Sequence, residues 1–238
     1  MERIAEMWDS LLTTQQPPET WVLVGSAVLA LAVIVGGRSW RLARYVVTLV
    51  HEAGHAGVAL LGGRRLHGIR LHSDTSGLTV TSGRPEGFGM VTTAAAGYPA
   101  PAALGLAAAA LLTAGHVDAA LWGFLALVTA VLVAVRNPFG LLTVVVTGGA
   151  LMAILAWGSE QAQGTAAYLL TWFLLAAAPR PVVELQRKRR RGRAPTSDAD
   201  QLAVLTGVPG ILWIGFFLVC TLGALALGSW WLLEPLVE

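Results

Sequence analysis

One short segment of the sequence combines the residue types and the spacing of a metal-dependent hydrolytic site. It reads His51-Glu52-Ala53-Gly54-His55. Residues four apart lie on the same face of an α-helix, so the two imidazoles can bind a single metal ion. The glutamate beside the first histidine can accept a proton from a water molecule that the metal activates. The pattern predicts His51 and His55 as metal ligands and Glu52 as the catalytic base.

The residues around this segment are apolar, unlike those around the same motif in a water-soluble metalloprotease. The run Tyr45–Leu61 has the composition of a membrane span. Ionisable side chains inside a span each cost roughly 3 kcal/mol to insert, so by default they mark a functional site. We therefore prefer a metal site to the alternative, in which the histidines form a structural hydrogen-bonded cluster with neighbouring helices.

The composition of the whole chain is that of an integral membrane protein. Of its 238 residues, 55% are hydrophobic and 13% are charged, whereas charged residues make up about 25% of a typical globular domain. The single cysteine, Cys220, excludes an internal disulfide and a cysteine-based zinc site. A formal net charge of +2 is no signature of a nucleic-acid partner, and the lipid bilayer is the expected surrounding.

The order of the apolar runs predicts an all-α polytopic membrane protein with about seven transmembrane helices, in a range of six to eight. Residues 1–20 are expected to form a polar leader with an interfacial helix, and residues 21–238 a single integral membrane domain. The third span is interrupted at Gly97–Pro101, since proline and glycine break helices. The expected spans are Trp21–Val35, Tyr45–Leu61, Met90–Leu112, Ala119–Val135, Leu141–Trp157, Ala166–Ala178 and Ile211–Leu233.

Two polar stretches separate these spans. Residues 63–89 alternate apolar and polar side chains around a turn at Ser73–Gly77, which predicts a small β-hairpin after the second span. A plain solvent-facing loop is the alternative, whereas a strand could hold an extended substrate by strand addition. Residues 184–200 contain the basic run Arg187–Arg193 and are expected to form a loop. With seven spans, the positive-inside rule places both stretches and the N-terminus in the cytoplasm, and the C-terminus outside the cell membrane.

Several further segments accompany the first motif. They are Gly62-Gly63-Arg64-Arg65-Leu66, the hairpin sequence Gly77–Thr81, Ala96-Gly97-Tyr98, Arg136–Gly140 and Ser197–Asp200. Together with the motif, they make the chain resemble the site-2 protease type of intramembrane zinc metalloprotease, and most closely the bacterial M50B-like branch. The resemblance runs from about Tyr45 to the last span, and it implies Zn²⁺ as the cofactor and a second membrane protein as the substrate.

The third metal ligand is where this chain departs from the pattern. Site-2 proteases take that ligand from an aspartate that follows an Asn-Pro pair, but after Asn137-Pro138 the residues up to Gly149 include no aspartate. Because it matches the Ser-Asp-Ala element, Asp198 is the preferred third ligand. Asn137, which is also a candidate contact for the substrate backbone, and Asp200 are the alternatives. The same segment also has the pattern of a helix N-terminus, with Ser197 as the cap and acidic residues in the first turn.

The resemblance implies a zinc metalloendopeptidase that cleaves membrane proteins within or near a transmembrane segment. The second hypothesis is an inactive M50-like scaffold that keeps the fold, which the missing aspartate favours and Glu52 argues against. A transporter is a third hypothesis, because a discontinuous helix is typical of transporters, but no internal repeat supports it. The oligomeric state is left open.

Overall fold

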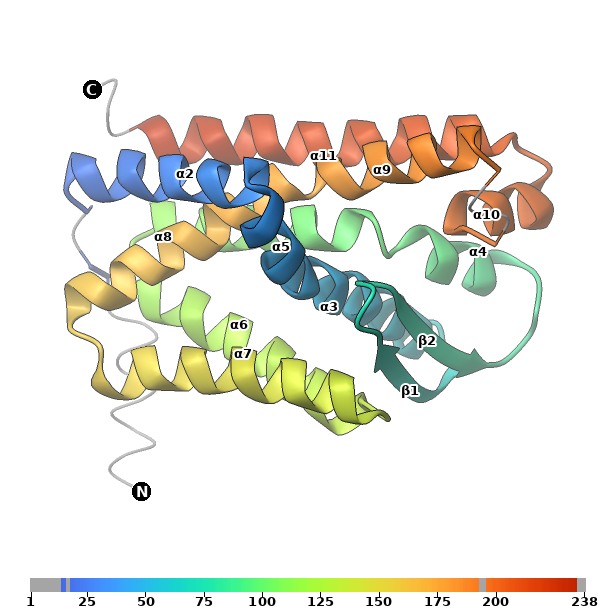
Figure 1. Ribbon diagram of the computed structural model, residues 1–238, viewed down its shortest axis with the longest axis horizontal. Helices are drawn as coiled ribbons and strands as arrows, with labels where there is room; N and C mark the ends of the chain where they lie inside the picture. Colours follow the sequence, from blue (N-terminus) through green and yellow to red (C-terminus); the bar gives the residue numbers. More distant parts are fainter. Residues whose placement is uncertain (1–13, 16–17, 193–195, 235–238) are drawn as a thin grey trace.

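The computed structural model describes residues 14–15, 18–192 and 196–234, and it is built almost entirely of helices (Figure 1). The interfacial helix predicted within residues 1–20 falls largely outside the described residues. The helices are α2 (Thr20–Val35), α3 (Gly37–Leu61), α4 (Phe88–Ala95), α5 (Pro99–Thr113), α6 (Val117–Ala134), α7 (Pro138–Trp157), α8 (Glu160–Ala177), α9 (Pro179–Arg190), α10 (Asp198–Thr206) and α11 (Gly210–Leu233).

Strands β1 (Arg65–Leu71) and β2 (Gly77–Ser82) form a two-stranded antiparallel sheet, which confirms the predicted hairpin. On its outer edge β1 also meets the segment that joins α6 to α7, through a parallel bridge between Ile69 and Val135. The sheet therefore lies between the motif helix and the start of α7.

Within the described residues, four helices are long and apolar enough to cross a membrane, namely α6, α7, the continuous run α8–α9 and α11. Two bent pairs, α2–α3 and α4–α5, raise the number to as many as six. This number of long apolar helices is that of a multi-pass membrane protein. The predicted count of seven spans is not confirmed. The predicted break of the third span is present, because α4 and α5 are bent by 70° on either side of Gly97.

The motif helix is sharply bent against the helix that precedes it. We expected Tyr45–Leu61 as a separate span, but α3 qualifies only together with α2, and the two helices are bent by 103°. The bend occurs at Gly36-Gly37, and the first turns of α3 carry Arg38, Arg41 and Arg44, which keep this half of the helix polar. As a result α3 leaves the end of α2 nearly at a right angle and runs towards the hairpin (Figure 1).

The basic run also takes a different form from the expected loop. Helix α9 continues α8 as far as Arg190, so that Arg187, Lys188, Arg189 and Arg190 form its last turn. Arginine and lysine are good helix formers, and positive charge is favoured at a helix C-terminus. Only a short connection is left between α9 and α10, and this brings the start of α10 back to the motif helix.

A small apolar cluster fixes α10 at the end of the bundle. It consists of Ala94, Val182, Leu185, Ala199, Leu202, Ile214 and Phe217, and joins α4, α9, α10 and α11. At the opposite end, Gln15, Gly115 and Glu234 line one cavity of about 210 Å³. The first and last described residues therefore lie at the same end of the bundle.

Candidate metal centre

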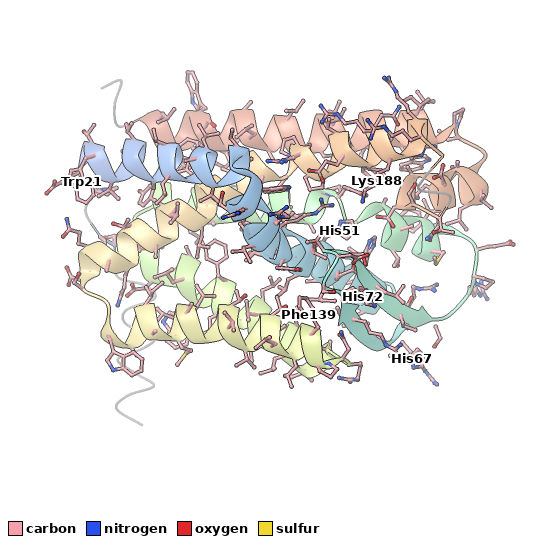
Figure 2. All side chains as sticks on the ribbon, in the orientation of Figure 1. Trp21, His51, His67, His72, Phe139 and Lys188 are labelled. Atoms are coloured by element: carbon pink, nitrogen blue, oxygen red, sulfur yellow. The ribbon has the colours of Figure 1, made fainter. Side chains whose placement is uncertain are left out.

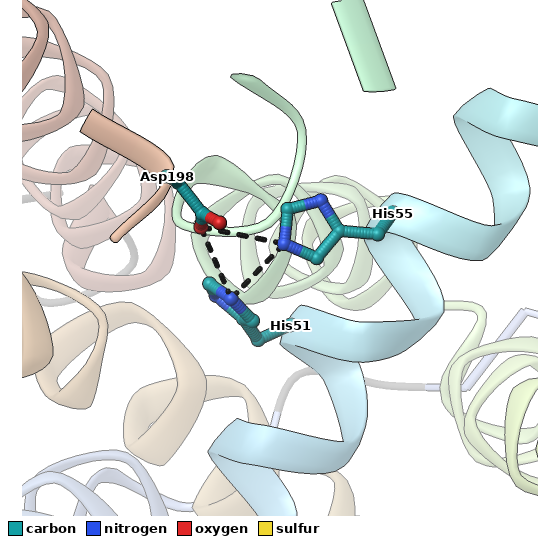
Figure 3. Close-up of side chains that lie close together, drawn as sticks. All are labelled: His51, His55 and Asp198. Carbon is teal, nitrogen blue, oxygen red and sulfur yellow. Dashed lines mark hydrogen bonds and ion pairs between the residues drawn. The ribbon is translucent and has the colours of Figure 1, made fainter. Parts of the chain in front are cut away.

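The structure brings His51, His55 and Asp198 together at the end of the bundle (Figure 3). The Nε2 atoms of the two histidines are 3.1 Å apart, and they lie 3.4 Å and 3.3 Å from Oδ2 of Asp198. Tetrahedral zinc with bonds of about 2.0–2.2 Å requires ligand atoms roughly 3.3–3.5 Å apart. The three atoms therefore already form a triangle of nearly the size that one zinc ion needs.

The orientation of His55 favours a cation at the centre of this triangle. Its Nδ1 lies 2.7 Å from the carbonyl oxygen of Thr93, to which it donates the ring proton. A neutral imidazole then has its lone pair on Nε2, the nitrogen that faces Asp198. An imidazole lone pair and a carboxylate oxygen 3.3 Å apart repel each other unless a cation, either a proton or a metal ion, lies between them. Such a second hydrogen bond commonly orients a metal-binding histidine.

Gly97 leaves the space that a metal ion would occupy. A Cβ atom at this position would lie 2.3 Å from Nε2 of His55 and 2.6 Å from Cε1 of His51. Any larger residue would therefore press on the metal-facing side of both rings. The donor set of two imidazoles and one carboxylate, together with this gap, fits zinc in a site that leaves its fourth position open.

Asp198 reaches the histidines because it is the first residue of α10. Ser197 caps this helix by accepting a hydrogen bond from the amide of Asp200, and negative charge is favoured in the first turn. Burial raises the pKa of the Asp198 carboxyl, but the neighbouring imidazoles outweigh that effect and hold its pKa below the ordinary value. The carboxylate is therefore ionised, as a metal ligand must be.

Asp200, one of the alternative ligands, is occupied elsewhere. Its carboxylate binds the guanidinium of Arg189 on α9 and accepts a 2.6 Å hydrogen bond from the hydroxyl of Ser197. The hydrogen bond from Arg189 lowers the pKa of Asp200. Asp200 thus fastens the start of α10 to α9, and the metal-ligand candidate is the residue two positions before it.

Asn137, the other alternative, binds the chain's own backbone. Its Nδ2 donates to the carbonyl of Leu71 at 2.7 Å, and its Oδ1 accepts from the amide of Leu71 at 3.1 Å. Both ends of the side-chain amide are therefore used on the edge of β1. The side chain of Asn137 thus pairs with the edge of β1 as a neighbouring strand would, and within the described residues it makes no hydrogen bond to His51, His55 or Asp198.

Glu52 is buried, with 4% of its surface exposed, although it lies on the same cavity as His51 and Asp198. Its Oε2 accepts a 2.6 Å hydrogen bond from the hydroxyl of Thr79 on β2. Gly77 lies directly against the carboxylate, since a Cβ there would come within 2.3 Å of Oε1. The hairpin thus covers the predicted base. Thr79 and Gly77 lie in the hairpin segment that carries the resemblance, but their residue types predict no contact with Glu52.

The cavity that contains these groups has a volume of about 310 Å³. Its walls are α3, the hairpin turn, the break between α4 and α5, and the α9–α10 connection. The lining is mostly polar and consists of Arg44, Val47, Thr48, His51, Glu52, Asp74, Thr75, Ser76, Gly77, Tyr98, Pro181, Lys188, Thr196, Ser197 and Asp198.

The other three histidines, His67, His72 and His116, are not among the residues that line this cavity. Figure 2 shows His67 and His72 on the hairpin, apart from His51. His67 is within 2.8 Å of the hydroxyl of Ser82, and His72 is within 3.3 Å of the hydroxyl of Ser76. Both are exposed surface residues, as their place in the hairpin predicts.

Comparison with known proteins agrees with this arrangement. Neither the curated proteins nor the solved structures contain a significant match to the chain. The sequence model of one family, described as peptidase M50B-like, matches residues 24–228, a stretch that includes the motif helix, the hairpin and α10. Since this match covers most of the chain, the protein belongs to the peptidase M50B-like family.

Proposed function

We propose that the protein is a zinc metalloprotease that cleaves other membrane proteins within or near their transmembrane segments. The observation that carries the proposal is the triangle of His51, His55 and Asp198, whose sides of 3.1–3.4 Å suit one tetrahedral ion. Glu52 lies on the same cavity. Two histidines, a carboxylate and a nearby glutamate are the groups that hydrolysis of a peptide bond by a metal site requires.

A zinc ion held by these three ligands would supply Lewis-acid activation of water and of the peptide carbonyl. The protein's own groups do the rest. Glu52 accepts the proton of the attacking water and later delivers it to the leaving amine. Thr93 keeps the proton of His55 on Nδ1, so that Nε2 stays available as a ligand. The hairpin and α4 exclude bulk water from the back of the site, where Glu52 and Thr93 are buried.

The position of the aspartate bears on the competing hypothesis of an inactive scaffold. That hypothesis drew its support from the missing aspartate after Asn137-Pro138. Asp198, from a different helix, lies within 3.4 Å of both histidines. A full ligand set with a glutamate beside it supports catalysis, because a scaffold has no use for a buried glutamate that lowers its stability.

We also propose that the end of the bundle with the metal centre faces the cytoplasm. Every described lysine and arginine lies at this end or in the segments leading to it: on α3, in residues 64–84, at Arg136, on α9 or at Arg191. The opposite end carries Glu19, Asp118, Glu160 and Glu234, with Trp21, Trp157 and Trp230 exposed there as interfacial anchors. Under the positive-inside rule the first and last described residues then both lie outside.

The test uses the full chain purified in detergent, with the membrane fraction of the expression host as a source of substrates. Wild type should contain about one zinc per chain and should generate new N-termini in or beside transmembrane segments, detected by mass spectrometry. Glu52→Gln should keep the zinc and generate none, whereas His55→Ala should lose both. Wild type that holds zinc but yields no termini beyond those of Glu52→Gln would refute the proposal.

A further inference from the structure

The hairpin is fastened to one stripe of the motif helix by three polar side chains. The hydroxyl of Tyr45 donates to the carbonyl of Ser73 at 2.7 Å, and the hydroxyl of Thr48 donates to the carbonyl of Thr75 at 3.0 Å. One further turn along α3, Glu52 meets Thr79. The first two contacts use backbone carbonyls of the turn, so they fix where the hairpin lies whatever its side chains are.

The third contact differs because a side chain of the hairpin, Thr79, donates it, and because its acceptor is Glu52, the proposed catalytic base. The Thr79 hydroxyl lies 2.6 Å from Oε2 of Glu52 and 3.1 Å from the backbone carbonyl of the same residue. A hydroxyl has one proton to donate, and the shorter, charge-assisted bond to the carboxylate is the stronger of the two. Thr79 is half-buried and Glu52 is 4% exposed, so water competes little for this proton.

We propose that Thr79 is a positioning residue for Glu52, and that β2 thereby sets the orientation of the catalytic base. The inference rests on the proposed function. A glutamate has three rotatable side-chain bonds, and a base works only when its oxygen lies within hydrogen-bond reach of the water it deprotonates. With Oε2 tied to Thr79 and Oε1 pressed by Gly77, the carboxylate is held by β2 at the wall of the cavity that contains His51 and Asp198.

The chain offers a matched control for this role. Thr81 lies two residues further along β2, on the same half-buried face, and within the described part of the chain its hydroxyl accepts a hydrogen bond from Arg64, at 3.4 Å, and makes none to Glu52. Thr79→Val and Thr81→Val make the same change of hydroxyl to methyl in the same strand. A general loss of strand stability would affect both variants, whereas loss of the bond to Glu52 affects Thr79→Val alone.

The experiment measures the initial rate at which new N-termini appear in the host membrane fraction, for wild type and three variants that each hold about one zinc per chain. Thr79→Val should lower this rate about 10-fold or more, since a positioned base contributes about 100-fold or more. Thr79→Ser, which restores the hydroxyl, should recover most of the rate, and Thr81→Val should match wild type. A double-mutant cycle of melting temperatures between Thr79→Val and Glu52→Ala, which removes the acceptor, should give non-additive shifts, independent of any activity.

The outcomes separate the two proposals. If wild type cleaves and Thr79→Val cleaves equally fast, the role of Thr79 is refuted while the protease stands. Additive melting shifts, or a serine variant as slow as the valine variant, also refute it. If wild type holds zinc and cleaves nothing, the proposed function fails first, and the role of Thr79 in catalysis fails with it.

Discussion

The guanidinium of Arg189 on α9 binds the carboxylate of Asp200 on α10, with Nε 3.0 Å and Nη2 2.5 Å from Oδ1. Arg189 also packs against Gly210 at the start of α11, where a Cβ would come within 2.4 Å of its Nη2. One side chain therefore joins the ends of three helices. Asp198 lies two residues before Asp200, so this pair sets the position of the carboxylate that we propose as the third metal ligand.

Loss of this pair should weaken metal binding. In Arg189→Gln the start of α10 loses its tie to α9, and we expect the zinc affinity to fall about 10-fold, the effect typical of residues that orient a ligand. Titration with a zinc-buffering chelator measures it. Arg190→Gln removes the same charge from an exposed neighbour in the same helical turn and should bind zinc like wild type. Equal affinities in both variants would contradict the role of Arg189.

The same pair predicts a pH dependence of stability. Arg189 lowers the pKa of Asp200 below its ordinary value of 3.8, so the pair stabilises the fold above about pH 3.8, and this contribution disappears as the pH falls through the folded-state pKa. Asp200→Asn should be less stable than wild type near neutral pH, by about 1 kcal/mol or less because the pair is partly exposed. Melting temperatures should converge as the pH falls below the ordinary pKa of 3.8; a difference that stays constant with pH would contradict this.

A methyl group at Gly97 should abolish the metal site. The Cβ of Gly97→Ala would lie 2.3 Å from Nε2 of His55, so the ring must turn away from Asp198 or the α4–α5 break must shift. We expect zinc content to drop to a small fraction of one ion per chain. Gly57→Ala on α3, where a Cβ meets nothing within 4 Å, is the matched control. Elemental analysis of both purified variants checks this, and full zinc in Gly97→Ala would show that the gap is not needed.

The proposed orientation can be measured by cysteine labelling. In a Cys220→Ala background, Ser73→Cys marks the hairpin turn and Gln161→Cys marks the start of α8, both at exposed positions. A membrane-impermeant maleimide applied to intact cells should label Gln161→Cys only, whereas inverted vesicles should give the reverse. Labelling of Ser73→Cys in intact cells would place the metal centre outside the cytoplasm.

The local features of the site follow from the sequence. The spacing of His51, Glu52 and His55, the hairpin turn, and the break at Gly97 all depend on short-range rules of helix period and turn chemistry. The structure agrees with each of these because residues a few positions apart decide them. Asp198 was chosen from a resemblance, and its place beside the histidines depends on packing between α4, α9, α10 and α11 that no local pattern encodes.

The features that the sequence did not predict depend on contacts between segments far apart in the chain. The direction of α3 depends on the bend at Gly36-Gly37, and apolar composition alone does not distinguish a bent helix from a straight span. Asn137 carries an amide that suits a ligand, a substrate contact or a backbone clamp equally well, and only the register of the bridge between Ile69 and Val135 directs it to Leu71. Thr79 lies in the hairpin segment that carries the resemblance, but threonine is common in strands, so its residue type predicts no contact with Glu52.

Helix α9 fastens both halves of the metal centre. Glu184 binds Arg44 and the indole of Trp40 on the motif helix, while Arg189, about one turn further on, binds the helix that starts with Asp198. The histidine side and the aspartate side are thus both attached to the continuous helix α8–α9. A tilt of this helix would carry the two sides together, so we expect the distances among His51, His55 and Asp198 to change little when the thickness of the bilayer changes.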